Sequence, residues 1–151
     1  MEYIYKQLTS SDVELLKQLL QVFGEAFNEI NTYQDNVPTD EYLTYLLAKQ
    51  DFITVVALCN NEVVGGLTAY VLEKFEQNRR EIYIYDLAVQ EQHRRKGIAT
   101  NVIHELKTIA KQKDAYVIYV QADHGDDAAI RLYESLGVKE DVFHFDIPIG
   151  D

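Results

Sequence analysis

A strand that leads through a cationic turn into a helix is the feature of this sequence that most constrains its fold. Apolar residues alternate along 81–89, as they do in a buried or half-buried strand. After a short acidic turn come Arg-Arg-Lys-Gly at 94–97 and a helix predicted from Ile98. Gly97 lets the backbone approach a ligand closely, and the unpaired N–H groups of a helix start attract anions. The segment therefore predicts a pyrophosphate site.

The spacing of this turn selects among pyrophosphate ligands. The segment has no Gly-Lys-Ser/Thr ending and no Gly-x-Gly-x-x-Gly pattern, so it contains neither the ATP-binding nor the dinucleotide-binding signature. Arg94-x-x-Gly97-x-Ala99 instead resembles the acetyl-CoA signature of the GNAT acetyltransferase superfamily. The alternative is that Gly97 only starts a helix and the cations are solvated. The resemblance implies that acetyl-CoA is held by Leu87, Ala88, Val89, Arg94, Arg95, Lys96, Gly97, Ile98, Ala99 and Thr100.

A second motif supports the same superfamily. Residues 129–137 resemble its short helix that carries a tyrosine, here Tyr133, and ends at a glycine, here Gly137. A plain amphipathic helix with a C-terminal glycine cap is the alternative. The order and separation of the two motifs favour the superfamily.

The resemblance extends to the first class of aminoglycoside 3-N-acetyltransferases. It is carried by residues 75–77, 81–89, 93–95, 115–123, 125–127 and 144–146. It implies acetyl transfer from acetyl-CoA to the 3-amino group of the deoxystreptamine ring of gentamicin-type antibiotics, and thus antibiotic resistance. It also implies a homodimer. His124 departs from the class, which carries tyrosine there, and this leaves the drug range open.

Composition predicts one domain over residues 1–151 with a full hydrophobic core. No apolar run reaches the roughly 20 residues of a membrane span, and no signal peptide is seen. The single Cys59 fits a reducing cytoplasm. A net charge of −11 argues against nucleic acid as a partner and suits a cationic substrate.

Hydrophobic patterns predict the order β-α-α-β-β-β-α-β-α-β. The resemblance implies that these elements form an α/β GNAT fold, whose mostly antiparallel sheet is flanked by helices. The expected strands are 3–8, 53–58, 63–75, 81–89, 116–122 and 142–147, the fifth of them in a covered sheet centre. A Ser11-x-x-Glu14 capping box should open the first helix, and a second helix should run from Pro38 to about Ala48. Asn60-Asn61 predicts a hairpin turn, and Gly65-Gly66 a bulge or close backbone approach.

An ammonium must lose a proton before it can attack a thioester, and a carboxylate can both anchor the cation and take that proton. Asp86, near the end of the central strand, is the first candidate for the base and Glu81 the second. A structural carboxylate bonded to a backbone N–H is the alternative for Asp86. A backbone N–H of Leu87 or Val89 could stabilise the oxyanion. The resemblance implies that Tyr133 returns a proton to the CoA thiolate.

An acidic wall for a polyamine is predicted from Asp123, Asp126, Asp127 and Asp146, with Tyr85, His124 and the first-helix residues Glu25 and Glu29 nearby. The alternative is that the loop aspartates cap a helix and complement its dipole. His124 is a rival base, and histidine spacing predicts no metal site. Two other functions stay open: an acetyltransferase for a polyamine or peptide amine, and a non-catalytic acetyl-CoA-binding sensor.

Overall fold

The computed structural model describes residues 2–150, which form two compact units, 2–121 and 122–150. The first unit contains the sheet and four α-helices, and the second contains one helix and an extended segment. No helix among the described residues is long and apolar enough to cross a bilayer. That residues 1–151 act as one domain stays a prediction.

The first unit is built on a five-stranded sheet in the order β1-β2-β3-β4-β5. Its pairs are antiparallel except for β4 and β5, which are parallel. The prediction of a mixed, mostly antiparallel sheet flanked by helices is confirmed. The strands are β1 Ile4–Gln7, β2 Phe52–Cys59, β3 Glu62–Glu73, β4 Arg80–Val89 and β5 Ala115–Val120.

The hairpin between β2 and β3 follows from its turn and glycine residues. Asn60 and Asn61 both adopt positive φ, which a tight hairpin turn requires and asparagine tolerates. Pairing shifts register after Ala57, so Val64 is an extra residue in β3. A Cβ on Gly66 would lie 2.5 Å from the Val55 carbonyl oxygen, so only glycine allows β2 and β3 to approach here. Both predictions for this hairpin are confirmed.

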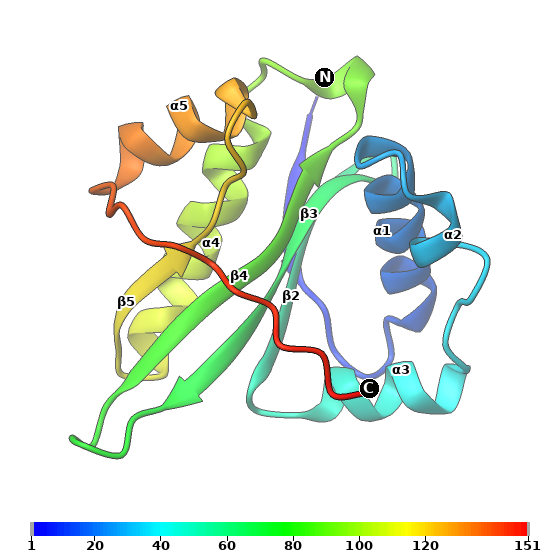
Figure 1. Ribbon diagram of the computed structural model, residues 1–151. Helices are drawn as coiled ribbons and strands as arrows, with labels where there is room; N and C mark the ends of the chain where they lie inside the picture. The colour runs from blue at the N-terminus through cyan, green and yellow to red at the C-terminus, as the bar shows by residue number, and fades with distance from the viewer. Residues whose placement is uncertain (1, 151) are drawn as a thin grey trace. The chain divides into compact units, whose positions relative to one another are not determined.

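Helices cover the two faces of this sheet (Figure 1). α1 (Val13–Ala26), α2 (Ile30–Tyr33) and α3 (Asp40–Ala48) lie on one side, where Leu19 and Phe23 pack on Phe52 and Val56. α4 (Ile98–Gln112) lies on the other side and buries Val102, Leu106 and Ile109, as predicted. The short helix α2 was not predicted, because its four residues show no helical period.

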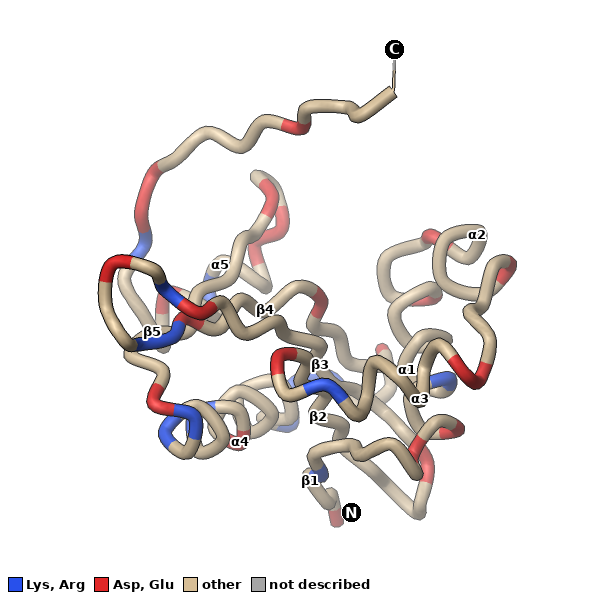
Figure 2. The backbone as a smooth tube through the Cα atoms, turned by 90° about the horizontal axis from the view of Figure 1, so that it is seen from below, with Lys and Arg blue, Asp and Glu red and all other residues tan. Residues whose placement is uncertain are grey.

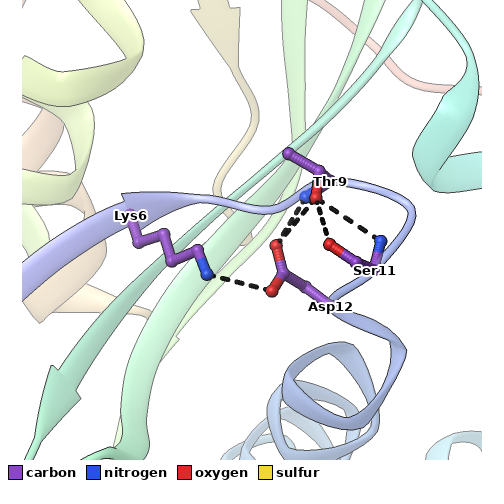
Figure 3. Close-up of polar contacts among 4 residues, drawn as sticks. All are labelled: Lys6, Thr9, Ser11 and Asp12. Atoms are coloured by element: carbon purple, nitrogen blue, oxygen red, sulfur yellow. Dashed lines mark hydrogen bonds and ion pairs between the residues drawn. The ribbon is translucent and has the colours of Figure 1, made fainter.

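The start of α1 differs from the predicted capping box. Asp12 is the N-cap, and neither Ser11 nor Glu14 forms the reciprocal bonds of such a box. The Asp12 carboxylate instead accepts hydrogen bonds from the Thr9 N–H at 2.8 Å and from Lys6 Nζ at 2.9 Å (Figure 3). Ser11 Oγ bonds Thr9 Oγ1 in the same turn. These contacts bind the end of β1 to the helix start and leave Ser11 outside the cap.

The strand β5 differs from its predicted central position. It pairs with β4 alone among the described residues, so it is an edge strand, and Tyr116, Val117 and Tyr119 are exposed. An apolar run cannot by itself distinguish a covered strand from an edge strand.

The second unit contains α5 (Asp127–Leu136), which ends at Gly137 as predicted. The predicted strand 142–147 is wrong as a sheet element: residues 138–147 are extended, but no described strand pairs with them. Phe143, Phe145, Ile147 and Ile149 alternate along this segment and are at least 81% exposed. An alternating pattern fixes the backbone shape, whereas pairing needs a partner strand.

Candidate active site

A bulge in β4 decides which side chains face the first-unit site. Thr68 of β3 pairs with Asp86, and Ala69 pairs with Ile84, so Tyr85 is an extra residue. The alternation of side chains therefore changes phase at Tyr85. Ile84 is buried, whereas Asp86 reaches the side of the sheet that carries α1 and α2.

Asp86 is held by a hydrogen bond from a distant tyrosine. The hydroxyl of Tyr33, the last residue of α2, donates to Asp86 Oδ2 at 3.0 Å. The Tyr33 ring meets Phe23 of α1 edge to face and Phe27, the C-cap of α1, at a tilt. The ring centroids are 5.9 and 5.7 Å apart, respectively. The Asp86 carboxylate is thus oriented by a side chain from another element.

Burial raises the pKa of Asp86 above its ordinary value, the Tyr33 hydrogen bond lowers it in part, and the Glu29 charge raises it. A base whose pKa is closer to neutral pH transfers protons more efficiently. Burial, followed by the charge of Asp86, also raises the pKa of Tyr33, so Tyr33 keeps its proton and acts as the donor. The surroundings of Asp86 are suited to proton transfer.

Glu81 lies at the other end of β4, five residues from Asp86 and thus roughly 16 Å along an extended strand. Its carboxylate accepts a hydrogen bond from the Tyr116 hydroxyl and pairs with Lys74 Nζ at 3.5 Å. The structure does not bring Glu81 and Asp86 together, and Glu81 already has two partners.

The end of β4 offers backbone that β5 does not cover. Pairing between these strands stops at Ile84 and Val120, while β3 pairs with β4 through Val89. The edge of residues 85–89 on the β5 side therefore has no strand partner in the described part of the chain. Leu87 and Val89, the predicted oxyanion donors, lie in this stretch.

The turn after β4 has the backbone of an anion site. A 3₁₀ turn, η1 (Glu91–His93), follows the strand, and Arg95 and Gly97 then adopt φ of 63° and 78°. Backbone curled in this way turns successive N–H groups toward an anion. No side chain caps α4, so the N–H groups of Ile98, Ala99 and Thr100 stay available. A pyrophosphate fits this turn by its donors and its charge.

The three cations of the turn are all exposed, but they differ in their contacts. Arg94 Nε donates to the Val89 carbonyl oxygen at 3.1 Å, which ties the turn to the strand end. No ion pair of Arg95 or Lys96 with a described carboxylate is seen. These two side chains are therefore open to an anionic ligand.

A cavity of about 460 Å³ lies between α1 and the end of β4. Its lining combines apolar Val22 and Val89 with the charged Glu25, Glu91 and Arg94. The sequence predicted Glu25 beside the cleft, and the structure places it in this lining. Carboxylates at the wall suit a ligand that carries ammonium groups.

Tyr133 lies in the middle of α5, in the second unit, and is partly buried. Burial, with a smaller contribution from the Asp126 charge, raises the pKa of Tyr133 to about 12. The phenol is therefore protonated at neutral pH. Proton transfer to a thiolate with a reference pKa of about 8.5 is uphill, so a donor role needs a site that favours the product.

The acidic loop contributes a helix cap, and its other carboxylates are exposed. Asp126 is the N-cap of α5 and accepts a hydrogen bond from the Ala129 N–H at 3.3 Å, while Asp127 lies in the first turn. Asp123 and His124 are exposed. Asp146 accepts or shares a hydrogen bond with His144 Nε2 at 2.8 Å. Residues 2–150 contain no group of three His, Cys, Asp or Glu arranged to hold a metal ion.

A model of the acetyltransferase (GNAT) family matches residues 16–138, which include the turn, Asp86 and Tyr133. The chain belongs to the GNAT acetyltransferase family. It is therefore an acetyltransferase, and enzymes of this family use acetyl-CoA.

Comparison with individual proteins shows which kinds of acetyltransferase this chain resembles. The aminoglycoside acetyltransferase HMB0005 from an uncultured soil metagenomic sample is 51% identical, with a TM-score of 0.97 over 99% of this chain and 100% of that one. The aminoglycoside acetyltransferase meta-AAC0020, also from soil and solved with sisomicin, is 33% identical, with a TM-score of 0.90 over 98% and 97%. An N-alpha-acetyltransferase of Saccharolobus solfataricus is 32% identical over 92 residues, 56% of this chain and 55% of that protein.

Sequence reasoning missed Tyr33 and the change of phase in β4. Tyr33 lies 53 residues from Asp86, and no local pattern links the two. The bulge did leave a signal, because the apolar positions run Ile82, Ile84 and then Leu87, a step of three in an alternation of two.

Proposed function

We propose that this acetyltransferase modifies an amine of an aminoglycoside of the gentamicin type, at the 3-amino position of the deoxystreptamine ring, and so confers antibiotic resistance. The observation that carries the proposal is the likeness to an aminoglycoside acetyltransferase over 99% of the chain at 51% identity. Two features of the first unit support it: the partly buried Asp86 carboxylate, and a cavity at the end of the same strand whose lining includes Glu25 and Glu91. Carboxylates of this kind accommodate ammonium groups.

Asp86 is the proposed base. It anchors the substrate ammonium and takes one proton from it, and the freed lone pair then forms a bond to the thioester carbon. An N–H of Leu87 or Val89 donates to the carbonyl oxygen while the carbon–sulfur bond breaks. The nitrogen loses its second proton to solvent, and the departing thiolate gains one from Tyr133, the role that the family resemblance implies. Exchange with solvent then returns a proton to Tyr133 and removes the proton from Asp86, so that one proton is released for each acetyl group transferred.

The turn 94–100 is the proposed pyrophosphate site of acetyl-CoA. Its free helix-start N–H groups and the exposed Arg95 and Lys96 supply the donors and the charge. The acetyl-CoA supplies the thioester, and no step of the proposal requires a metal ion.

The acidic loop is the proposed wall for the remaining ammonium groups, through Asp123, Asp127 and Asp146, with His124 beside them. Asp126 serves mainly as a helix cap.

We also propose that the protein works as a cytoplasmic homodimer. The exposed apolar side chains of 143–149 support association of two copies, since monomers rarely expose such patches.

A protein N-terminal amine is the second candidate substrate, favoured by the 32% identity to an N-alpha-acetyltransferase over part of the chain. A silent acetyl-CoA sensor is disfavoured, because it needs no oriented carboxylate with a raised pKa beside the acetyl site.

A direct comparison of acceptors tests the proposal. The purified protein is incubated with acetyl-CoA and gentamicin, spermidine or an alanine-terminated peptide, and free thiol is measured. We expect the highest kcat/KM with gentamicin, a single N-acetyl group located at the 3-amino nitrogen by NMR, and growth of a sensitive bacterial host on the drug. A preference for the peptide or spermidine would overturn the proposal.

A further inference from the structure

Aromatic rings form a continuous row across four neighbouring strands of the first unit. Four tyrosines make up this tyrosine ribbon: Tyr70 of β3, Tyr83 and Tyr85 of β4, and Tyr119 of β5. Tyr83 stacks on Tyr119 with centroids 4.7 Å apart and planes at 7°. Tyr85 meets Tyr83 and Tyr70 edge to face, each at 5.9 Å. The row ends on the buried Phe52 of β2, whose ring centroid lies 5.4 Å from that of Tyr70.

The rings of the ribbon are open to solvent although they are large. Tyr85 is 60% exposed, and Tyr70 and Tyr119 are also exposed. Only Tyr83 directs its hydroxyl to a described partner, Gln121 Oε1 at 2.8 Å. Exposed aromatic faces with unpaired hydroxyls are typical of a binding surface, because they combine an apolar body with a polar tip.

The bulge in β4 brings this ribbon beside the proposed base. Because Tyr85 is the extra residue, Tyr85 and Asp86 follow each other in sequence and still reach the same side of the sheet. Burial raises the pKa of both Tyr70 and Tyr83, and the charge of Asp86 adds to it, which agrees with the carboxylate lying close to both rings. Bulges commonly redirect side chains beside active sites.

The ribbon also differs in its charges from two other exposed tyrosines, Tyr45 and Tyr116. Tyr45 has Lys49 Nζ 5.5 Å from its ring centre, and Tyr116 has the Arg79 guanidinium 3.9 Å away. No such cation lies over a ribbon ring in residues 2–150. Tyr83 and Tyr119 each use one face to stack on the other, whereas the exposed rings of Tyr70 and Tyr85 are open to an external cation, next to a carboxylate that attracts one.

We propose that the tyrosine ribbon is a subsite for an amino-sugar ring of the acceptor, which lies on the tyrosine faces while Asp86 holds the amine that reacts. A sugar ring offers a flat C–H face to an aromatic ring, and its ammonium groups interact with the ring quadrupole. The ribbon would thus select cyclic polyamines over linear ones. This inference rests on the proposed function and extends it to residues outside the carboxylate wall.

Binding of gentamicin and of spermine, measured by calorimetry, tests the subsite. Tyr85→Leu and Tyr70→Leu remove ribbon rings, Tyr85→Phe keeps the ring, and Tyr45→Leu is the control outside the ribbon. A cation on a ring is worth about two- to thirtyfold in affinity. We expect the two ribbon Leu variants to lose that much gentamicin affinity and less spermine affinity. Tyr85→Phe and Tyr45→Leu should stay within about twofold of the parent.

Three results would overturn the subsite: ribbon Leu variants that bind gentamicin like the parent, equal losses for gentamicin and spermine, or a Tyr85→Phe variant as weak as Tyr85→Leu. Sedimentation of the same variants identifies the alternative, since an interface between copies would lose association and not drug affinity. Turnover is measured separately. A parent that binds gentamicin through the ribbon without acetylating it would refute the proposed function alone, and an active parent with ribbon-independent KM would refute the subsite alone.

Discussion

Asp86, the proposed base, carries a cost to stability. Its pKa is raised by burial, so the folded protein disfavours the ionised carboxylate. At low pH the group is protonated in both folded and unfolded chains and costs nothing. The cost grows as the pH rises from the unfolded-state pKa to the higher folded-state pKa, and it is complete above the folded-state pKa.

Asp86→Asn should therefore abolish turnover and stabilise the fold at neutral pH. The amide keeps the shape and can still accept the Tyr33 hydrogen bond, but it cannot take a proton. Thermal unfolding at pH 7 should show a higher midpoint, by about 2–4 °C for each kcal/mol gained, and the gain should vanish toward pH 3. An active Asp86→Asn variant together with an inactive Glu81→Gln variant would show that Glu81, and not Asp86, is the base.

Tyr33→Phe should change the pH dependence of catalysis and leave the packing intact. The hydroxyl donates to Asp86 and lowers the pKa of that carboxyl, so its removal should raise the pKa further. The base is then protonated at higher pH, and the acidic limb of kcat/KM should move upward. Tyr45→Phe, an exposed tyrosine of α3, is the matched control. A limb that stays in place would show that Tyr33 does not act through Asp86.

Tyr133→Phe tests the proposed proton donor. The substitution keeps the ring on α5 and removes its hydroxyl. General acid catalysis contributes about 10²–10⁴, so kcat should fall within that range while the KM for acetyl-CoA changes little. A loss confined to thermal stability would indicate that Tyr133 is a packing residue, which its raised pKa of about 12 also allows.

At the scale of the elements, the turn that precedes α4 allows the effect of charge on CoA binding to be tested separately from the effect of backbone strain. Gly97 has φ of 78°, and a Cβ there would meet only Asn101 Nδ2, at 3.9 Å. Asparagine tolerates this backbone better than other side chains and is neutral. Gly97→Asn should thus retain most CoA affinity, whereas Gly97→Asp should lose it through repulsion of phosphate. Calorimetry with CoA measures the affinity of both variants. Equal CoA affinities would contradict a pyrophosphate site at this turn.

Local patterns predicted most of the elements, and long-range contacts account for what they missed. The hairpin at Asn60–Asn61, the close approach at Gly66 and the helix after Gly97 each depend on residues next to one another. The Tyr33–Asp86 bond and the edge position of β5 depend on which segments meet in the fold. The capping box at Ser11 does not form because the N-cap lies one residue later, at Asp12, whose carboxylate bonds Thr9 and Lys6 and not a helix N–H.

At the scale of the whole molecule, the distribution of charge along the chain bears on which ligands the protein attracts. Acidic positions dominate the chain around α1, α2 and α3, where Lys17 is the one basic residue of 13–48 (Figure 2). Such a distribution raises the local concentration of cationic ligands and weakens as salt is added, over about 8–10 Å. The polycationic substrate proposed above agrees with this surface.

The exposed apolar segment near the C-terminus should carry the proposed dimer. Phe143 and Phe145 lie on one side of an extended backbone, with ring centres 6.3 Å apart, and His144 alternates with them. Phe143→Ser combined with Phe145→Ser should convert a dimer into a monomer in sedimentation velocity, while His144→Ala should not. A parent that sediments as a monomer, or a double variant that stays dimeric, would contradict this.

The tyrosine ribbon also determines how this protein absorbs and emits light. The chain has eleven tyrosines and no tryptophan, so indole emission does not mask the phenols. Two of them, Tyr83 and Tyr119, are stacked face to face 4.7 Å apart, close enough for their transitions to couple. The ribbon should therefore dominate the near-ultraviolet circular dichroism. Its occupation could then be followed in the native protein without any attached label.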